Sequence, residues 1–389
     1  MKKSLAVLSL GLGLSLISPD LLQANDLVLR PIEVNNQRQQ NLGLDEQLWG
    51  KANQPGDRYK LVKAIDHSLA FLQTNKARQA YQDYPIPGVS RSKVIRSLRR
   101  FRQLLIQARS PQELQTAVQK EFVWYRSIGK DNQGTVSFTG YFEAVYPASL
   151  IPTSEYRYPL YRQPEDFKNW QQPHPKRLEL EGKNGLLGKN SPLSGYELVW
   201  LKNRLDAFLV QVQGSARLEL TNGKIMTVGY DGGTSYPYVS IGGELIKDGI
   251  FQANELTLPA LINYFEANPE QLDNYLPRNN RFVFFRSTNG ALPQGSIGVP
   301  VTPDRSIATD KSIMPAGALA LIKTFIPYPN DLGELEKRQV SRYVLDQDTG
   351  SAIKGAGRVD IFLGTGKLAQ ERAGLVNDTG ELYYLFLKE

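Results

Sequence analysis

From Ser137 to the C-terminus, the chain consists mainly of short runs in which apolar and polar residues alternate. Such alternation is typical of strands with one buried face, and glycine-rich turns separate the runs. One helical segment is expected at about 256–274, and strands at 208–212, 217–220, 281–286, 319–322, 341–345, 359–363 and 382–387. A series of strands after a helical N-terminal region favours closed barrels over parallel βαβ units. We therefore expect a mainly β fold with a helical N-terminal region.

Two helices are expected before this part, after a polar, irregular stretch at 25–58. The second begins at Ser110-Pro111, a capping residue followed by proline at the first helical position. The first has one apolar stripe at helical spacing, formed by Val94, Leu98, Phe101 and Leu105. Its other face is basic and is either solvated or a contact surface for an anionic wall or membrane. That face carries Arg91, Lys93, Arg96, Arg99, Arg100 and Arg102.

The first residues are typical of a secretory signal peptide. Lys2 and Lys3 precede an apolar stretch from Leu5 to Ile17, and Leu22-Gln23-Ala24 offers a cleavage point. Because this stretch is shorter than the ~20 residues of a membrane span, we expect cleavage near Ala24 rather than an uncleaved anchor. We assign residues 1–24 to the signal peptide.

The chain has no cysteine, which excludes disulfides, thiolate ligands for zinc and a thiol nucleophile. It also lacks a lipobox cysteine, so we expect an exported protein of the periplasm or cell envelope without a lipid anchor. The formal charge of +7 suits an anionic partner, and export argues against nucleic acid. Nothing around His67 or His174 suggests a catalytic triad, and we expect neither a metal nor a cofactor.

One aspartate stands out chemically. Asp360 lies inside an apolar strand, between Val359 and Ile361. Ionisation is disfavoured there, so its pKa should rise, as a general acid near neutral pH requires; an edge-strand aspartate facing water is the alternative. Asp348-Thr349-Gly350 and Asp378-Thr379-Gly380 match the triplet of aspartic proteases, but they are only thirty residues apart, too close for two protease lobes.

Several blocks of the chain, from about 137 to 389, resemble the membrane-bound lytic murein transglycosylase A family. They occur in the same order and with similar spacing, at 138–143, 212–215, 238–242, 268–285, 308–317 and 348–360. The resemblance implies a double-psi β-barrel domain with a second β-barrel domain inserted. Residues 25–143 would form the helical region and the first part of the double-psi barrel, 144–289 the inserted domain, and 290–389 the remaining, three-aspartate part. A glycan groove would run between the domains.

The resemblance also implies an activity. Family members cleave the β-1,4 bond between N-acetylmuramic acid and N-acetylglucosamine in peptidoglycan and leave 1,6-anhydromuramic acid ends. Asp360 would act as general acid and then as base, because the C6 hydroxyl of the substrate is the nucleophile. A non-catalytic polysaccharide-binding protein on the same scaffold is the alternative.

Further site residues follow from the same resemblance. Asp348 and Asp310 would orient loops or stabilise developing positive charge, and turn hydrogen bonding is the alternative role for both. We expect a monomer acting on peptidoglycan glycan strands, with candidate substrate contacts at Tyr141, Gln213, Ser215, Tyr238 and Lys354.

Overall fold

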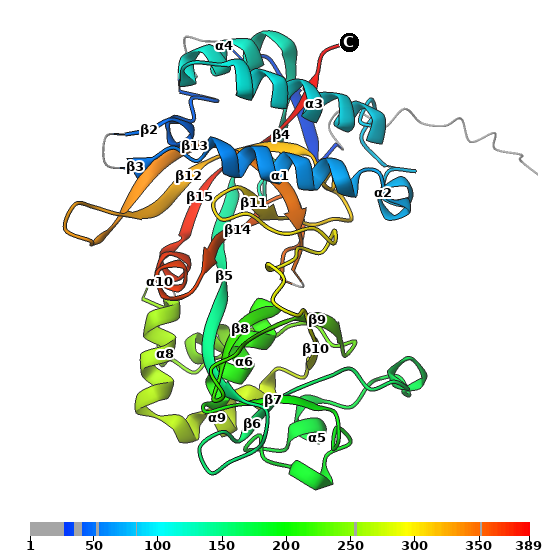
Figure 1. Ribbon diagram of the computed structural model, residues 1–389, viewed down its shortest axis with the longest axis vertical. Helices are drawn as coiled ribbons and strands as arrows, with labels where there is room; N and C mark the ends of the chain where they lie inside the picture. Colours follow the sequence, from blue (N-terminus) through cyan, green and yellow to red (C-terminus); the bar gives the residue numbers. More distant parts are fainter. Residues whose placement is uncertain (1–26, 35–40, 52–53, 83, 253–254, 351) are drawn as a thin grey trace, which may run out of the picture.

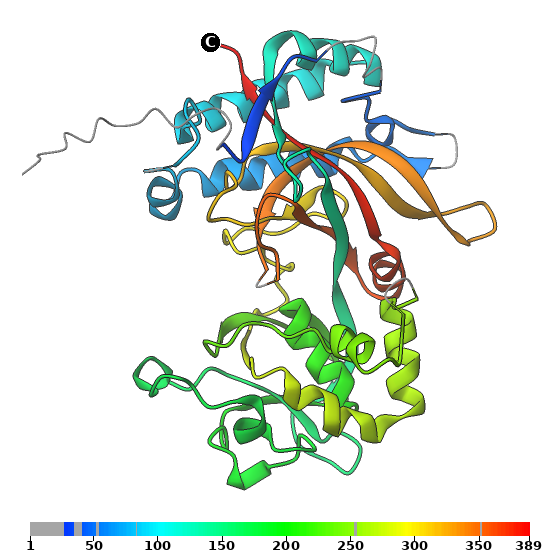
Figure 2. The same cartoon turned by 180° about the vertical axis from the view of Figure 1, so that it is seen from behind.

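The computed structural model describes residues 27–34, 41–51, 54–82, 84–252, 255–350 and 352–389. It has two lobes, and the long strand β5 (Val136–Ser149) runs from one into the other (Figures 1 and 2). The signal peptide predicted for residues 1–24 lies outside the described residues. Within the described ranges, no helix is long and apolar enough to cross a membrane.

The first lobe is built on a closed barrel. Besides β5 it contains β11 (Ser306–Ala308), β12 (Leu319–Pro329), β13 (Leu335–Asp348), β14 (Arg358–Thr365) and β15 (Asn377–Leu387). These strands pair in the order β5–β14–β11–β13–β12–β15, and the ring closes because β15 also pairs with β5. The pairs β5–β14 and β11–β13 are parallel and the others antiparallel. The strands predicted at 319–322, 341–345, 359–363 and 382–387 all lie in this barrel.

The N-terminal helices cover the barrel at the end away from the second lobe (Figure 1). They are α1 (Arg58–Phe71), α2 (Asn75–Ala80), α3 (Arg91–Gln107) and α4 (Pro111–Glu121). The predicted apolar stripe of α3 is buried, and Ser110 caps α4 as expected. The interpretation of 25–58 as irregular is partly wrong, because this stretch contains β1 (Leu29–Ile32), which pairs with β4 (Phe122–Ser127). It also contains the short pair β2 (Gly50–Lys51) and β3 (Gln54–Pro55).

The basic face predicted on α3 is largely occupied by contacts within the protein. Four of its cations have partners: Arg91 donates to the carbonyl of Leu72, Lys93 pairs with Glu389, Arg100 with Glu121 and Arg102 with Asp66. These contacts hold α3 against neighbouring segments. Contact of this face with the wall or membrane stays a prediction.

The second lobe contains a sheet with the order β6–β7–β5–β8–β9–β10, in which β10 returns next to β6. Its strands besides β5 are β6 (Tyr158–Tyr161), β7 (Glu197–Leu201), β8 (Ser215–Leu220), β9 (Ile225–Gly233) and β10 (Val283–Ser287). Its helices are α5 (Arg177–Glu181), α6 (Arg204–Gln213), α7 (Ile241–Lys247), α8 (Leu258–Ala267) and α9 (Leu272–Tyr275). Strand β5 pairs with β14 as far as Glu143 and with β8 from Ala144 onward. A last helix, α10 (Lys367–Leu375), packs on β5 and β14 of the barrel.

The strand predicted at 208–212 is wrong, because these residues belong to helix α6. This helix lies between two apolar clusters: Phe208 and Leu209 belong to one, Ala207 and Val210 to the other. A helix that is buried on opposite sides has a continuous apolar run, which periodicity alone cannot distinguish from a buried strand. Gly214, at φ 78°, ends the helix in the left-handed conformation.

Candidate functional site

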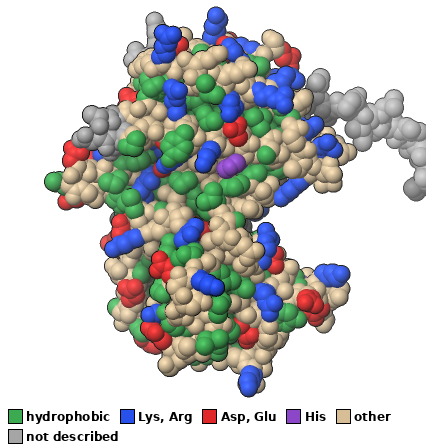
Figure 3. Space-filling model, viewed as in Figure 1, with side chains coloured by type: hydrophobic (Ala, Val, Ile, Leu, Met, Phe, Trp, Pro, Cys, Tyr) green, Lys and Arg blue, Asp and Glu red, His purple; other side chains and the backbone are tan. Residues whose placement is uncertain are grey.

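The two lobes face each other across a cleft with a volume of about 1150 Å³. Figure 3 shows it as an indentation between the upper and lower parts of the molecule. The barrel contributes side chains from β5, β14 and the loop after β13, and the second lobe contributes the end of α6 with β8, β9 and β10. All the site residues predicted from the sequence except Asp310 line this cleft, namely Tyr141, Gln213, Ser215, Tyr238, Asp348, Lys354 and Asp360.

Asp360 lies in the third position of β14, between β11 and β5. Its neighbours Val359 and Ile361 are fully buried and point into the barrel core, so Asp360 points to the other side, toward the cleft. The Thr139 hydroxyl donates to Asp360 Oδ1 over 2.8 Å. Burial raises the pKa of Asp360 to about 6 despite this hydrogen bond. The carboxyl therefore keeps its proton at a pH where an exposed aspartate is ionised.

Asp348 is held at the end of β13 by hydrogen bonds to both carboxylate oxygens. Oδ1 accepts from the backbone N–H groups of Ser296 and Thr349, and Oδ2 accepts from the Tyr141 hydroxyl, each over 2.8 Å. Burial raises the pKa of Asp348, while these hydrogen bonds oppose the rise. Because its oxygens are occupied, the geometry suits a side chain that fixes Tyr141 and two loops.

Asp310 has no side-chain atom in the cleft wall and instead ties two loops together. Its Oδ1 accepts from the backbone N–H and hydroxyl of Ser312, and its Oδ2 accepts from the backbone N–H of Gly355 over 2.8 Å. Burial would raise the pKa of Asp310, but these hydrogen bonds outweigh it and the pKa is lowered. These contacts suit both the loop-orienting role and the alternative of turn hydrogen bonding, and they place Asp310 behind the segment that connects Asp348 to Asp360.

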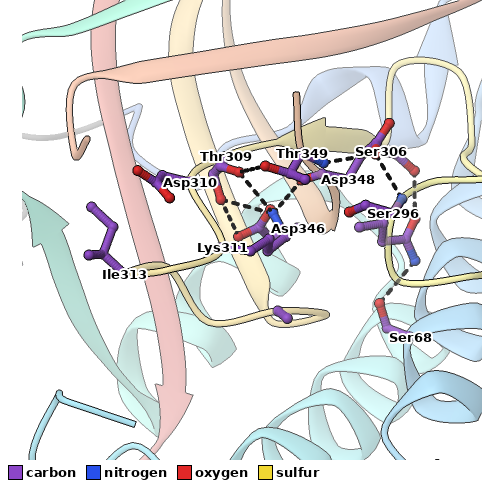
Figure 4. A network of polar contacts seen from close by, with 12 residues as sticks. Ser68, Ser296, Ser306, Thr309, Asp310, Lys311, Ile313, Asp346, Asp348 and Thr349 are labelled. Carbon is purple, nitrogen blue, oxygen red and sulfur yellow. Dashed lines mark hydrogen bonds and ion pairs between the residues drawn. The ribbon is translucent and has the colours of Figure 1, made fainter. Parts of the chain in front are cut away.

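A buried ion pair that the sequence analysis did not identify supports the same segment (Figure 4). Lys311 Nζ lies 2.5 Å from Asp346 Oδ1 and donates to the backbone carbonyl of Asp348. Asp346 is fully buried, and its Oδ2 accepts from the hydroxyls of Thr309 and Tyr384. The available signal was Asp346 itself, an acidic residue directly after the apolar run 343–345 and two positions before Asp348.

The predicted substrate contacts differ in how much of each side chain is available. The Tyr141 hydroxyl is bonded to Asp348, and its ring lies against Phe362 with 5.1 Å between the centroids. Gln213 Oε1 accepts from the backbone N–H of Phe142 over 3.2 Å. Tyr238 packs on the apolar cluster around α7 and α8, whereas Lys354 is exposed at the cleft margin. Tyr141, Gln213 and Tyr238 thus have packing or hydrogen-bonding roles within the protein.

Neither histidine lies in the cleft wall. His67 Nδ1 lies 3.0 Å from the carbonyl of Pro300, and the buried His174 accepts from the backbone N–H of Ser235. Among the described residues, no group of three or more His, Asp or Glu side chains is placed to hold a metal ion.

Comparisons with known proteins agree with this architecture. A family model described as the MltA specific insert domain matches residues 137–286, and one described as the 3D domain matches residues 305–386. The membrane-bound lytic murein transglycosylase A of Vibrio cholerae is 31% identical over 357 residues, which cover 88% of this chain and 92% of that protein. The protein of the same name from Escherichia coli K12 is 31% identical over 259 residues, covering 66% of this chain and 67% of that protein.

Solved structures share the fold. A membrane-bound lytic murein transglycosylase from Agrobacterium tumefaciens superimposes with a TM-score of 0.70 at 24% identity, covering 92% of this chain and 97% of that chain. The E. coli protein with bound chitohexaose superimposes with a TM-score of 0.66 at 26% identity, covering 89% and 96%. These likenesses confirm the predicted fold class.

Proposed function

Because the chain belongs to the membrane-bound lytic murein transglycosylase A family, we propose that its cleft binds a peptidoglycan glycan strand and that Asp360 cleaves it. The protein is an enzyme, a peptidoglycan-cleaving lyase of the cell envelope. The observation that supports Asp360 is its position: a carboxyl on the cleft wall whose pKa of about 6 keeps it protonated in mildly acidic solution.

The reaction needs one proton carrier from the protein. The protonated Asp360 donates to the oxygen that links N-acetylmuramic acid to N-acetylglucosamine, and the bond from that oxygen to C1 breaks. The ionised Asp360 then takes the proton of the C6 hydroxyl on the same muramoyl residue as its oxygen bonds to C1. The product end is 1,6-anhydromuramic acid, no water is consumed, and Asp360 regains its proton. The hydroxyl attacks within one molecule, so it is present at a high effective concentration.

We assign the other residues of the cleft wall to binding the glycan strand. Tyr141, Gln213, Ser215, Tyr238 and Lys354 are proposed contacts because they line the cleft from both lobes. We assign 144–289 to the inserted domain, since β5 changes partner after Glu143 and β10 ends at Ser287. We also propose that the protein is a monomer of the periplasm without a lipid anchor. Its helix α3 would make peripheral contact with the wall or membrane.

The pH dependence tests the role of Asp360. The proton must be present on the free enzyme, so kcat/KM is expected to fall about tenfold per pH unit above a pH of about 6. Release of soluble fragments from purified peptidoglycan, followed from pH 5 to 8, measures this. A rate that is flat across this range would contradict the assignment. If the protein binds the glycan strand but releases no soluble fragments at any pH, it would instead be a non-catalytic polysaccharide-binding protein.

A further inference from the structure

Two side chains beside Asp360 have no role in the mechanism above. The parallel pairing of β5 and β14 sets Thr139 directly opposite Asp360. Arg358 lies two residues before Asp360 in the same strand, so both side chains point to the same face, and both line the cleft. Arg358 Nη2 donates to Thr139 Oγ1 over 3.2 Å, and Thr139 Oγ1 donates to Asp360 Oδ1 over 2.8 Å. The three side chains thus form a directed chain of hydrogen bonds.

The direction of this chain follows from its donors. A guanidinium group only donates hydrogen bonds, so Thr139 Oγ1 is the acceptor in its contact with Arg358. The Thr139 hydroxyl in turn gives its one hydrogen to Asp360 Oδ1. Asp360 Oδ1 is therefore an acceptor, and a proton on Asp360 belongs on Oδ2.

Resting on the proposed function, we propose that Thr139 and Arg358 are positioning residues that keep the acidic proton of Asp360 on Oδ2, where the glycosidic oxygen must approach. Oδ2 then also receives the proton of the C6 hydroxyl. Both halves of the reaction use one oxygen of one carboxyl, and the side chain need not rotate between them.

The charged groups around Asp360 show why Arg358 is assigned the positioning role. Among the described residues the buried Nε of Arg358 has no hydrogen-bond partner, and the charge of Arg358 acts on Asp360, where it lowers the pKa of the carboxyl. The other titratable groups that face Asp360 are Asp348 at the end of β13 and Tyr141 on β5. From the remaining neighbours, β11 places Ala308 opposite Asp360. Helix α10 buries Ala369, Arg372 and Ala373, and Arg372 is paired with Asp304 instead. Arg358 is thus the cation beside Asp360, and with Thr139 it limits the rise that burial causes in the pKa of Asp360.

The test compares Thr139→Val, which removes the hydroxyl, with Thr139→Ser, which keeps it. In Thr139→Val we expect the pKa of Asp360 to rise, the alkaline limb of the pH–rate profile to move to higher pH, and kcat to fall about 10- to 100-fold. Thr139→Ser should restore the profile. Thr324→Val is the matched control, since Thr324 is buried in the same barrel and its hydroxyl has no hydrogen-bond partner among the described residues.

Arg358→Gln tests whether the arginine acts through the threonine. It removes the charge, so the pKa of Asp360 should rise in this variant as well. The loss of kcat in the Thr139→Val, Arg358→Gln double variant should be smaller than the product of the two single losses, because both changes interrupt one chain.

A titration of the Asp360 carboxyl carbon by NMR separates this proposal from the proposed function. An unchanged pKa in Thr139→Val, with folding intact, would overturn the positioning role. A raised pKa that Thr139→Ser reverses would support it, even for an enzyme preparation that released no anhydro product. Only that missing product would count against the proposed function itself.

Discussion

Asp360→Asn is expected to lower the rate of peptidoglycan cleavage by about 10²- to 10⁴-fold, the contribution typical of a general acid–base group. The asparagine amide has nearly the same shape as the carboxyl, so the glycan strand can still bind. The amide can neither donate an acidic proton nor accept one from the C6 hydroxyl. Release of soluble fragments from purified peptidoglycan measures the rate, and co-sedimentation with insoluble peptidoglycan measures binding.

Two controls make this result specific. Asp378→Asn changes the aspartate of the other Asp-Thr-Gly triplet, which lies at the start of β15 and pairs with Lys337 at the surface. A surface pair contributes little, so activity and stability should stay near wild type. The pKa of Asp360 is raised from 3.8 to about 6 in the folded state, so stability falls as the pH rises between these values, and the full cost is present at pH 8. Asp360→Asn should therefore be no less stable than wild type at pH 8. Full activity in this variant would remove Asp360 from the mechanism.

The second large effect is expected on stability. Arg305 is fully buried and pairs with two buried carboxylates, Asp45 at 2.5 Å and Asp57. Arg305→Met leaves both carboxylates without their cation inside the protein, so we expect a loss of about 3–5 kcal/mol in the free energy of unfolding. Denaturant unfolding at neutral pH measures the change.

The matched control for this prediction is Arg338→Met. Arg338 is partly exposed, and its guanidinium lies 4.0 Å from Glu336, so its loss should cost less than about 1 kcal/mol. Equal stabilities of the two variants would contradict the importance of the buried cluster. That cluster joins the segment before α1 to the barrel, so the Arg305 variant should also lose protection from proteolysis around Asp45 and Asp57.

The barrel strands could be predicted because each buries one face. The alternation around Val359, Ile361 and Leu363 gave β14, and the same pattern placed Asp360 in apolar surroundings. The capped helix α4 was also predictable, because Ser110 and its following proline are local signals. Local signals failed for α6, whose two buried sides hide its helical period.

The partners of Asp360 could not be predicted in the same way. Thr139 lies 221 positions away in the sequence and reaches Asp360 only through the register of two parallel strands. The Lys311–Asp346 pair likewise joins a loop to a strand. Sequence patterns identify which residues favour burial, but the pairing of distant strands decides which side chains meet.

The central claim is that the substrate, not water, supplies the nucleophile. The source of the oxygen bonded to C1 at the cleaved position tests this claim most directly. Purified peptidoglycan is digested in water enriched in ¹⁸O, and the fragments are analysed by mass spectrometry. We predict 1,6-anhydromuramic ends, one water lighter than hydrolysis products and free of ¹⁸O at the cleaved position. Reducing ends that carry ¹⁸O would contradict this account and would require a carboxylate that activates water.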